Sequence, residues 1–226
     1  MFQKIVTRAL FAGFCAGLVA AALQFMLVQP VLLHAELYEG GALVHFGAEA
    51  VSAHPELPGF DPVRDGLSLL FSALIYVGYA LLLVAAMSMA AERGFEINAR
   101  TGLIWGVAGF VAFHFAPAVS LPPEVPGVAA GDVGARQIWW WSTVAATAAG
   151  LALIGLSRSG AAWTLGAALI LAPHVVGAPQ PDSFAGPVPP EIAALFASRA
   201  LGVGLAVWAV MGALAGYFWQ REGDPA

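Results

Sequence analysis

The chain has 226 residues, of which 60% are hydrophobic and only 10% are charged, and its formal net charge is −5. Because an average soluble domain carries about a quarter charged residues, this composition excludes an ordinary soluble protein and indicates an integral membrane protein in a lipid bilayer. The negative charge disfavours nucleic acid as a partner, since phosphate backbones bind basic surfaces.

Six apolar stretches are long enough to be helices that cross the bilayer. They lie at residues 9–33, 67–91, 103–121, 138–156, 161–178 and 192–219. The fourth and fifth are separated only by residues 157–160 and are short for a crossing, so two re-entrant halves are the alternative there. We therefore expect an all-α, polytopic membrane protein with six transmembrane helices arranged as three hairpins.

The basic residues set the expected orientation, because cytoplasmic connections carry an excess of lysine and arginine. An N-terminus on the cytoplasmic side places six of the nine basic residues on that side: Lys4, Arg8, Arg93, Arg100, Arg158 and Arg221. Both termini are then cytoplasmic, and the acidic residues gather outside, where an outer loop is expected at residues 34–65. No soluble domain is visible, so we expect residues 1–226 to form a single integral-membrane domain.

A weak internal repeat relates the three hairpins, which cover approximately residues 5–91, 100–156 and 158–219. Each hairpin has an arginine near its start, and a polar residue follows that arginine 14 or 16 positions later. The arginines are Arg8, Arg100 and Arg158, and the polar residues are Gln24, His114 and His174. A rise of 1.5 Å per residue places these polar groups roughly 20 to 24 Å from the arginines, at one level toward the outer side.

Prolines accompany each member of this polar level. Pro30 is expected to end the first span, Pro117 follows His114, and Pro173 precedes His174. A proline inside a helix frees a backbone carbonyl, which in lipid needs a protein partner, water or a cation. The kinks therefore either line a polar cavity or only shape the bundle, and the sequence leaves both interpretations open.

Ionisable side chains within the apolar layer are costly and mark functional sites by default. Neutral imidazole binds cobalt, nickel, zinc or haem iron, and outer carboxylates would complete the coordination shell of a divalent cation. The candidate metal ligands are His114, His174, Glu124, Glu36 and Glu39. A histidine that only forms hydrogen bonds between helices is the alternative for each of the two imidazoles.

Four further residues are candidates for structural or gating roles: Arg136, Gln24, Pro117 and Pro173. Arg136 begins the fourth helix just after an acidic segment, so an ion pair with Glu124 or Asp132 is expected. Its permanent positive charge prevents it from binding a metal ion.

Two other functions are compatible with the same pattern. The two histidines could be axial ligands of a haem, or each could bind a (bacterio)chlorophyll. The chain could also be a structural or assembly subunit of a larger membrane complex, because small residues at four-residue spacing permit close helix contact. These residues are Gly13 and Gly17, Gly102 and Gly106, and Gly212 and Gly216.

Sequence motifs of ATP hydrolysis, zinc proteases and serine hydrolases are absent, so we do not expect an enzyme.

Several short motifs, taken in order, resemble those of the CbtA family of proposed cobalt transporter subunits over essentially the full length of the chain. They are AELYE at residues 35–39, LPPEVPG at 121–127, RQIWW at 136–140 and PHVVGAPQP at 173–181. The position of Gln24 ahead of Pro30 also resembles the pattern of this family. The resemblance directs attention to His114, His174, Glu124, Glu36, Glu39 and Arg136.

The resemblance implies a bacterial cytoplasmic membrane protein that takes part in cobalt transport with a small, single-span, histidine-bearing subunit of the CbtB type. Two features depart from the family pattern. The outer loop lacks a dense run of histidines, and Arg199 occupies a helix in which neutral residues are expected.

Overall fold

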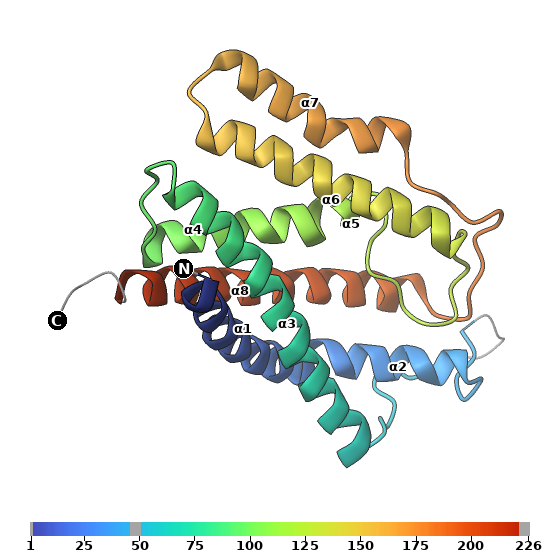
Figure 1. Cartoon of the computed structure of the whole chain (residues 1–226). Coiled ribbons are helices and arrows are strands. Elements are labelled where there is room, and N and C mark those ends of the chain that lie inside the picture. The colour runs from blue at the N-terminus through green and yellow to red at the C-terminus, as the bar shows by residue number, and fades with distance from the viewer. Residues whose placement is uncertain (1, 46–50, 222–226) are drawn as a thin grey trace. The chain divides into compact units, whose positions relative to one another are not determined.

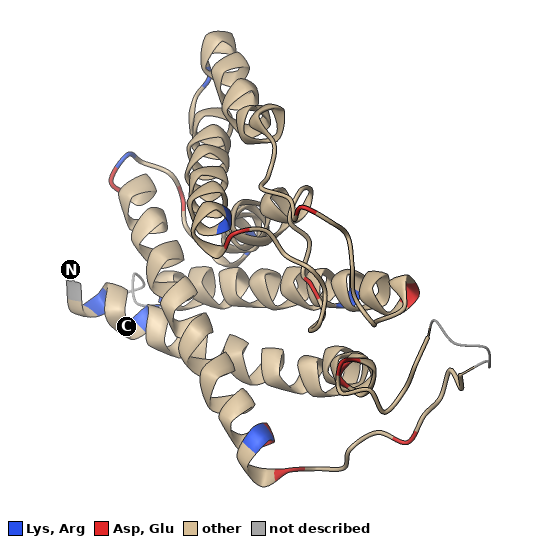
Figure 2. Ribbon diagram, turned by 90° about the vertical axis from the view of Figure 1, so that its right-hand side faces the viewer, with Lys and Arg blue, Asp and Glu red and all other residues tan. Residues whose placement is uncertain are grey.

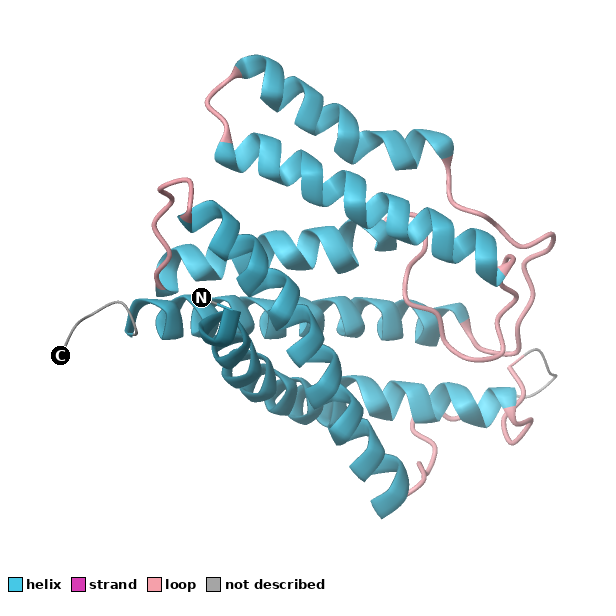
Figure 3. Cartoon of the chain, in the orientation of Figure 1, coloured by secondary structure: helices cyan, strands magenta, loops and turns pink. Residues whose placement is uncertain are grey.

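The computed structural model describes residues 2–45 and 51–221, so residues 46–50 of the expected outer loop lie outside the described residues. Helices make up the ordered elements, and the described residues contain no strand (Figure 3). In chain order they are α1 (Phe2–Leu23), the π-helical turn η1 (Gln24–Val28), α2 (Gln29–Glu39), α3 (Pro62–Ala91), α4 (Ala99–Phe110), the π-helical turn η2 (Val111–Phe115), α5 (Ala116–Ala118), α6 (Val133–Leu156), α7 (Gly160–Val176) and α8 (Pro190–Arg221) (Figure 1).

Five helical segments of the described chain are long and apolar enough to cross a membrane. They are Gln3–Glu39, Pro62–Ala91, Ala99–Ala118, Val133–Leu156 and Pro190–Arg221. α7 is the sixth apolar helix and has 17 residues, a length of about 25 Å against a hydrocarbon layer of about 30 Å. The all-α architecture of a polytopic membrane protein is confirmed, with α7 as the short member.

The distribution of charge agrees with this architecture. Figure 2 shows Lys, Arg, Asp and Glu mainly near helix ends and in the connecting segments, while the helix middles are nearly free of them. Charged groups avoid the hydrocarbon layer because their transfer from water is unfavourable, whereas the helical backbone satisfies its own hydrogen bonds there.

The first span continues beyond the point that the sequence predicted. Pro30 does not end the helix, because it occupies the first turn of α2, where its missing N–H group is tolerated. α2 then runs to Glu39, and Gly40 donates its N–H group to the Glu36 carbonyl at the helix end. The connection that we expected on the outer side therefore begins after Glu39 and ends at Pro62, which places Glu36 and Glu39 on a helix.

The chain divides into two compact units. The first unit comprises Met1–Leu23, Phe60–Phe113 and Val203–Ala226, and the second comprises Gln24–Gly59 and His114–Gly202. All nine site residues named from the sequence fall within the ranges of the second unit. The single domain at residues 1–226 and its three hairpin repeats stay predictions.

In the first unit, glycines allow two pairs of helices to pack at backbone contact. A Cβ atom at Gly17 would meet the backbone of Ala73 in α3, so α1 and α3 pack closely, as expected for the first hairpin. α4 packs against the C-terminal part of α8, where a Cβ atom at Gly106 would clash with the Trp208 carbonyl oxygen and the Gly212 backbone. The four-residue spacing of glycines seen in the sequence is thus used for helix packing.

The second unit contains a different close pair, α6 and α7. Gly150 of α6 and Gly166 of α7 face each other, and a Cβ atom on either glycine would meet the backbone carbonyl of the other. Contacts therefore extend across residues 157–160, the boundary between the second and third expected hairpins.

Substitution Gly106→Ala tests the close approach of α4 and α8. We expect it to lower the free energy of unfolding by about 1 to 3 kcal/mol, because the methyl group forces two packed backbones apart. The matched control is Gly78→Ala in α3, where an added Cβ atom meets no other atom within 4 Å. The control should be neutral or stabilising by up to about 1 kcal/mol, since alanine is the better helix former. Unfolding in mixed micelles measures both, and equal stability of the two variants would contradict the packing.

Candidate functional site

Two helical segments contain a π-helical turn at a residue that the sequence repeat singled out. Gln24 begins the turn η1, and His114 lies in the turn η2. Each turn has five residues and ends two residues before a proline, Pro30 in one case and Pro117 in the other. Single π turns inside α-helices are frequent at functional sites. The repeat seen in the sequence therefore has a local structural counterpart in its first two members.

The third member of the repeat differs, because Pro173 and His174 lie within the last turns of α7 without a π turn. The Pro173 carbonyl accepts a hydrogen bond from the Gly177 N–H group at 3.0 Å. It also accepts one from the indole Nε1 of Trp139 at 3.2 Å. Trp139 is buried on α6, so this bond ties the end of α7 to its neighbouring helix.

His174 is held by two residues that the sequence analysis did not assign to the site. Its Nδ1 atom lies 3.2 Å from the hydroxyl oxygen of Ser120, and its ring meets the Trp139 ring edge-on at a centroid distance of 6.0 Å. When Nδ1 carries the hydrogen, the ring donates to Ser120 and Nε2 presents a lone pair. Histidines that bind metals usually have their second nitrogen fixed in this way. Trp139 lies within the RQIWW motif, and the need of a buried indole N–H group for an acceptor is the signal that could have found it.

Ser120 connects His174 to the segment that carries His114. It lies six residues after His114, a rise of about 9 Å if the helical path continues. The side chain of His114 itself has a buried Nε2 atom. The second unit thus brings the end of α7 against the stretch that directly follows the π turn η2.

The cation of Arg199 has a structural partner at the other π turn. Its guanidinium NH1 donates a hydrogen bond to the backbone carbonyl of Leu27, within η1, at 2.9 Å. A charged donor strengthens such a bond where water is scarce. This contact accounts for the arginine in a helix where the sequence led us to expect neutral residues.

Arg136 forms the expected ion pair with Glu124. The guanidinium NH2 lies 2.5 Å from the carboxylate of Glu124, and both side chains are partly buried. Asp132 instead caps α6, since its carboxylate accepts the N–H group of Ala135 at 2.8 Å. Of the two partners left open by the sequence, the structure selects Glu124.

Glu36 and Glu39 are both exposed on α2, and Glu39 lies beside the turn that follows Glu124. Gly127 adopts a positive φ of 79°, which favours glycine, and an added Cβ atom would meet the Cγ atom of Glu39 at 3.2 Å. The same segments contribute to a small buried cluster, which consists of Ala35, Tyr38, Val125 and Val188. The segments AELYE and LPPEVPG, together with the connection after α7, therefore fold together as an ordered cap.

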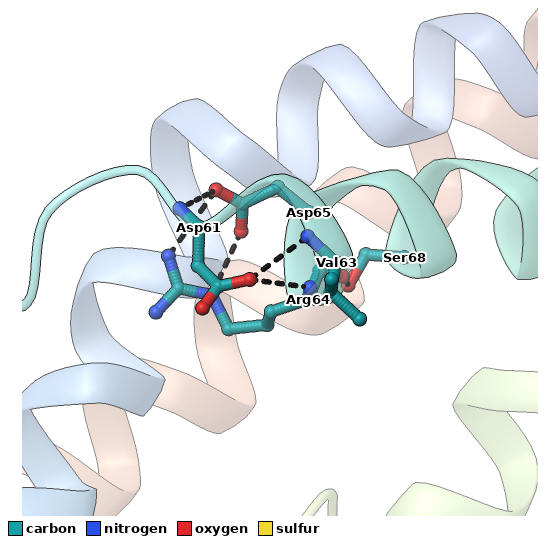
Figure 4. A network of polar contacts seen from close by, with 5 residues as sticks. All are labelled: Asp61, Val63, Arg64, Asp65 and Ser68. Carbon is teal, nitrogen blue, oxygen red and sulfur yellow. Dashed lines mark hydrogen bonds and ion pairs between the residues drawn. The ribbon is translucent and has the colours of Figure 1, made fainter.

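Two other acidic residues of the expected outer face are engaged at the start of α3. Asp61 caps the helix by accepting the N–H groups of Val63 and Arg64 at 2.8 and 2.9 Å (Figure 4). The buried carboxylate of Asp65 accepts the Asp61 N–H group and forms an ion pair with Arg64 at 2.8 Å (Figure 4). These carboxylates serve the helix terminus, which reduces the acidic surface open to a cation.

Within residues 2–45 and 51–221, no group of three or more His, Cys, Asp or Glu side chains is arranged to hold a metal ion. The ligand set His114, His174, Glu124, Glu36 and Glu39 therefore stays a prediction. The structure links His174 to the His114 segment through Ser120, and Glu39 to the Glu124 turn through Gly127.

A comparison with protein families supplies the context for this arrangement. The model of the family described as "Probable cobalt transporter subunit (CbtA)" matches residues 2–220. The chain belongs to the CbtA family. No curated protein and no solved structure matches the chain. The family indicates a subunit of a cobalt transporter, and the apolar helices indicate a membrane protein.

A double-mutant cycle tests the pair between Arg136 and Glu124 of this CbtA protein. Arg136→Gln and Glu124→Gln should each lower the free energy of unfolding. The loss in the double variant should be smaller than the sum of the two single losses by about 0.2 to 1 kcal/mol, which is the coupling free energy of the pair. The control cycle combines Arg136→Gln with Asp132→Asn, because asparagine keeps the helix cap. A larger coupling to Asp132 than to Glu124 would show that the ion pair is assigned to the wrong carboxylate.

Proposed function

We propose that this CbtA protein is the membrane subunit through which a divalent cation, cobalt, crosses the bacterial cytoplasmic membrane. His114 and His174 provide imidazole ligands at the polar level, and Glu124, Glu36 and Glu39 attract the cation on the outer side. The chain crosses the membrane several times with both termini in the cytoplasm. Cobalt is the substrate in this proposal.

The observation that carries the proposal is the hydrogen bond between His174 and Ser120. It holds one of the two intramembrane imidazoles against the stretch that follows the other. His114 lies in the π turn η2, and prolines accompany both histidines. Interrupted helices at equivalent places of a repeat are typical of ion and substrate sites in transporters. Imidazole is also a suitable ligand for cobalt, because nitrogen donors bind divalent first-row metals well.

The energy for entry is available without nucleotide hydrolysis. Each positive charge that moves inward gains about 2.3 kcal/mol per 100 mV of inside-negative membrane potential, so a divalent ion gains twice that. The acidic residues on the outer side raise the local concentration of cations before they enter. A small single-span subunit of the CbtB type is the proposed partner, and an association with a larger membrane complex would be built on the same surface helices.

Cobalt uptake by proteoliposomes tests the proposal. The chain is reconstituted alone and together with the single-span subunit, with a metal-quenched dye inside and an imposed inside-negative potential. The double variant His114→Ala/His174→Ala should lose at least about tenfold in initial rate, the effect of removing two ligands in a dry site. His45→Ala is the matched control, because His45 is exposed and outside the helices.

Uptake by the control at the rate of the unmodified protein shows that loss of a histidine alone is harmless. Equal uptake by the double variant and the unmodified protein would remove His114 and His174 from the pathway. An absence of cobalt flux in every preparation, with the partner present, would contradict the transport function itself.

A further inference from the structure

One cation on an apolar helix lacks a negatively charged partner. Arg199 lies on α8, and its guanidinium group donates a hydrogen bond to the backbone carbonyl of Leu27 at 2.9 Å. In the part of the chain that the structure describes, this is the one hydrogen bond of the guanidinium, and no carboxylate forms an ion pair with it. The carbonyl satisfies one N–H group but does not neutralise the charge, which is costly in lipid unless an anion compensates for it.

The position of Arg199 along α8 places it at an edge of the hydrocarbon layer. Residues 200–218 contain no charged side chain, and the helix continues to Arg221. From Arg199 to Trp219 the helix rises about 30 Å, which equals the thickness of the hydrocarbon layer. Because tryptophan favours the boundary between lipid and water, Arg199 lies at the opposite boundary from Trp219.

Leu27 reaches this boundary by a separate helical path. From Lys4 through η1 to Leu27 the path rises about 34 Å. The path begins at the membrane surface where Trp219 lies, since Arg8, one turn after Lys4, is 4.1 Å above the Trp219 ring. The contact of Arg199 with Leu27 is therefore near the lipid phosphates of the other leaflet, which a long arginine side chain can reach.

Apolar side chains around this contact are open on the surface. Met26 and Leu27 of η1 are 72% and 41% exposed, and Leu195, one helical turn from Arg199, is 42% exposed. The Ser198 hydroxyl donates to the Leu195 carbonyl of its own helix, so it does not compete for the guanidinium. Lipid acyl chains suit the apolar side chains, and an anionic headgroup suits the arginine between them.

We propose that Arg199, held against η1, binds the phosphate group of a phospholipid. One guanidinium N–H group stays on the Leu27 carbonyl, and the others donate to phosphate oxygens. The planar guanidinium matches phosphate geometry, and hydrogen bonds between charged groups are stronger than neutral ones. An anionic headgroup such as phosphatidylglycerol is favoured over a zwitterionic one, because it brings no cation of its own.

The bound lipid neutralises Arg199 and stabilises its contact with η1. Both residues of that contact belong to the second unit, and η1 also contains Gln24. The site makes no use of His114 or His174, so it does not depend on the proposed transport of cobalt.

Native mass spectrometry of the full chain in detergent, titrated with phosphatidylglycerol, tests the site. Arg199→Gln should weaken the binding of one lipid about fivefold, the effect of one basic residue at an anionic lipid surface. Arg199→Lys should weaken it about twofold, since lysine keeps the charge but lacks the planar fork. Arg158→Gln is the matched control, because Arg158 is an exposed arginine of the same unit outside the helices, and it should bind as the unmodified protein does.

Equal binding by Arg199→Gln and Arg158→Gln would overturn the proposal. If Arg199→Gln does not fold, unchanged binding by Arg199→Lys would overturn it instead.

Two further titrations identify the ligand. A diglucosyl diacylglycerol with the same acyl chains has no phosphate, so it should bind equally to the unmodified protein and to the Arg199 variants. A loss of this glycolipid in the variants as large as the loss of phosphatidylglycerol would contradict phosphate recognition. Inorganic phosphate at millimolar concentration should not displace phosphatidylglycerol, and displacement would assign the site to free phosphate instead of a lipid.

Discussion

The structure depends on the requirement that backbone polar groups be satisfied within a membrane. Regular α-helix meets this requirement along most of the chain, because each N–H group has a carbonyl partner in the same helix. Near the interruptions of the regular pattern, two side chains donate hydrogen bonds to backbone carbonyls. Arg199 donates to the Leu27 carbonyl in one π turn, and Trp139 donates to the Pro173 carbonyl at the end of α7. Both contacts lie in the second unit, which also contains every residue proposed for cation binding.

The two units distribute structural and chemical roles differently. Close glycine contacts between α1 and α3 and between α4 and α8 give the first unit its packing, and its polar residues mainly cap or pair at helix ends. The second unit has the π turn η1, the histidines and an ordered cap around Tyr38 and Val125. The cap holds the Glu124 turn against Glu39, so the carboxylates of these two residues belong to a folded surface and not to a free loop.

Much of this organisation could be predicted from the sequence because it depends on local composition and spacing. Apolar length indicated the helices, and the order of charges indicated the pair of Arg136 with an acidic neighbour. The spacing from each arginine singled out Gln24 and His114, which both lie in π turns, while their common level in the membrane stays a prediction. The continuation of α2 beyond Pro30 could not be predicted, because a proline after a π turn is accommodated by that turn. The bond between His174 and Ser120 joins residues 54 positions apart and needs the tertiary structure.

The central claim is that His114 and His174 bind the transported cation through imidazole nitrogen, and X-ray absorption at the cobalt edge tests it most directly. The measurement uses the reconstituted chain loaded with cobalt. The account predicts nitrogen ligands with the scattering pattern of imidazole, which disappears when His114→Ala and His174→Ala are added. A cobalt shell of oxygen atoms alone in the protein that retains His114 and His174 would contradict the account.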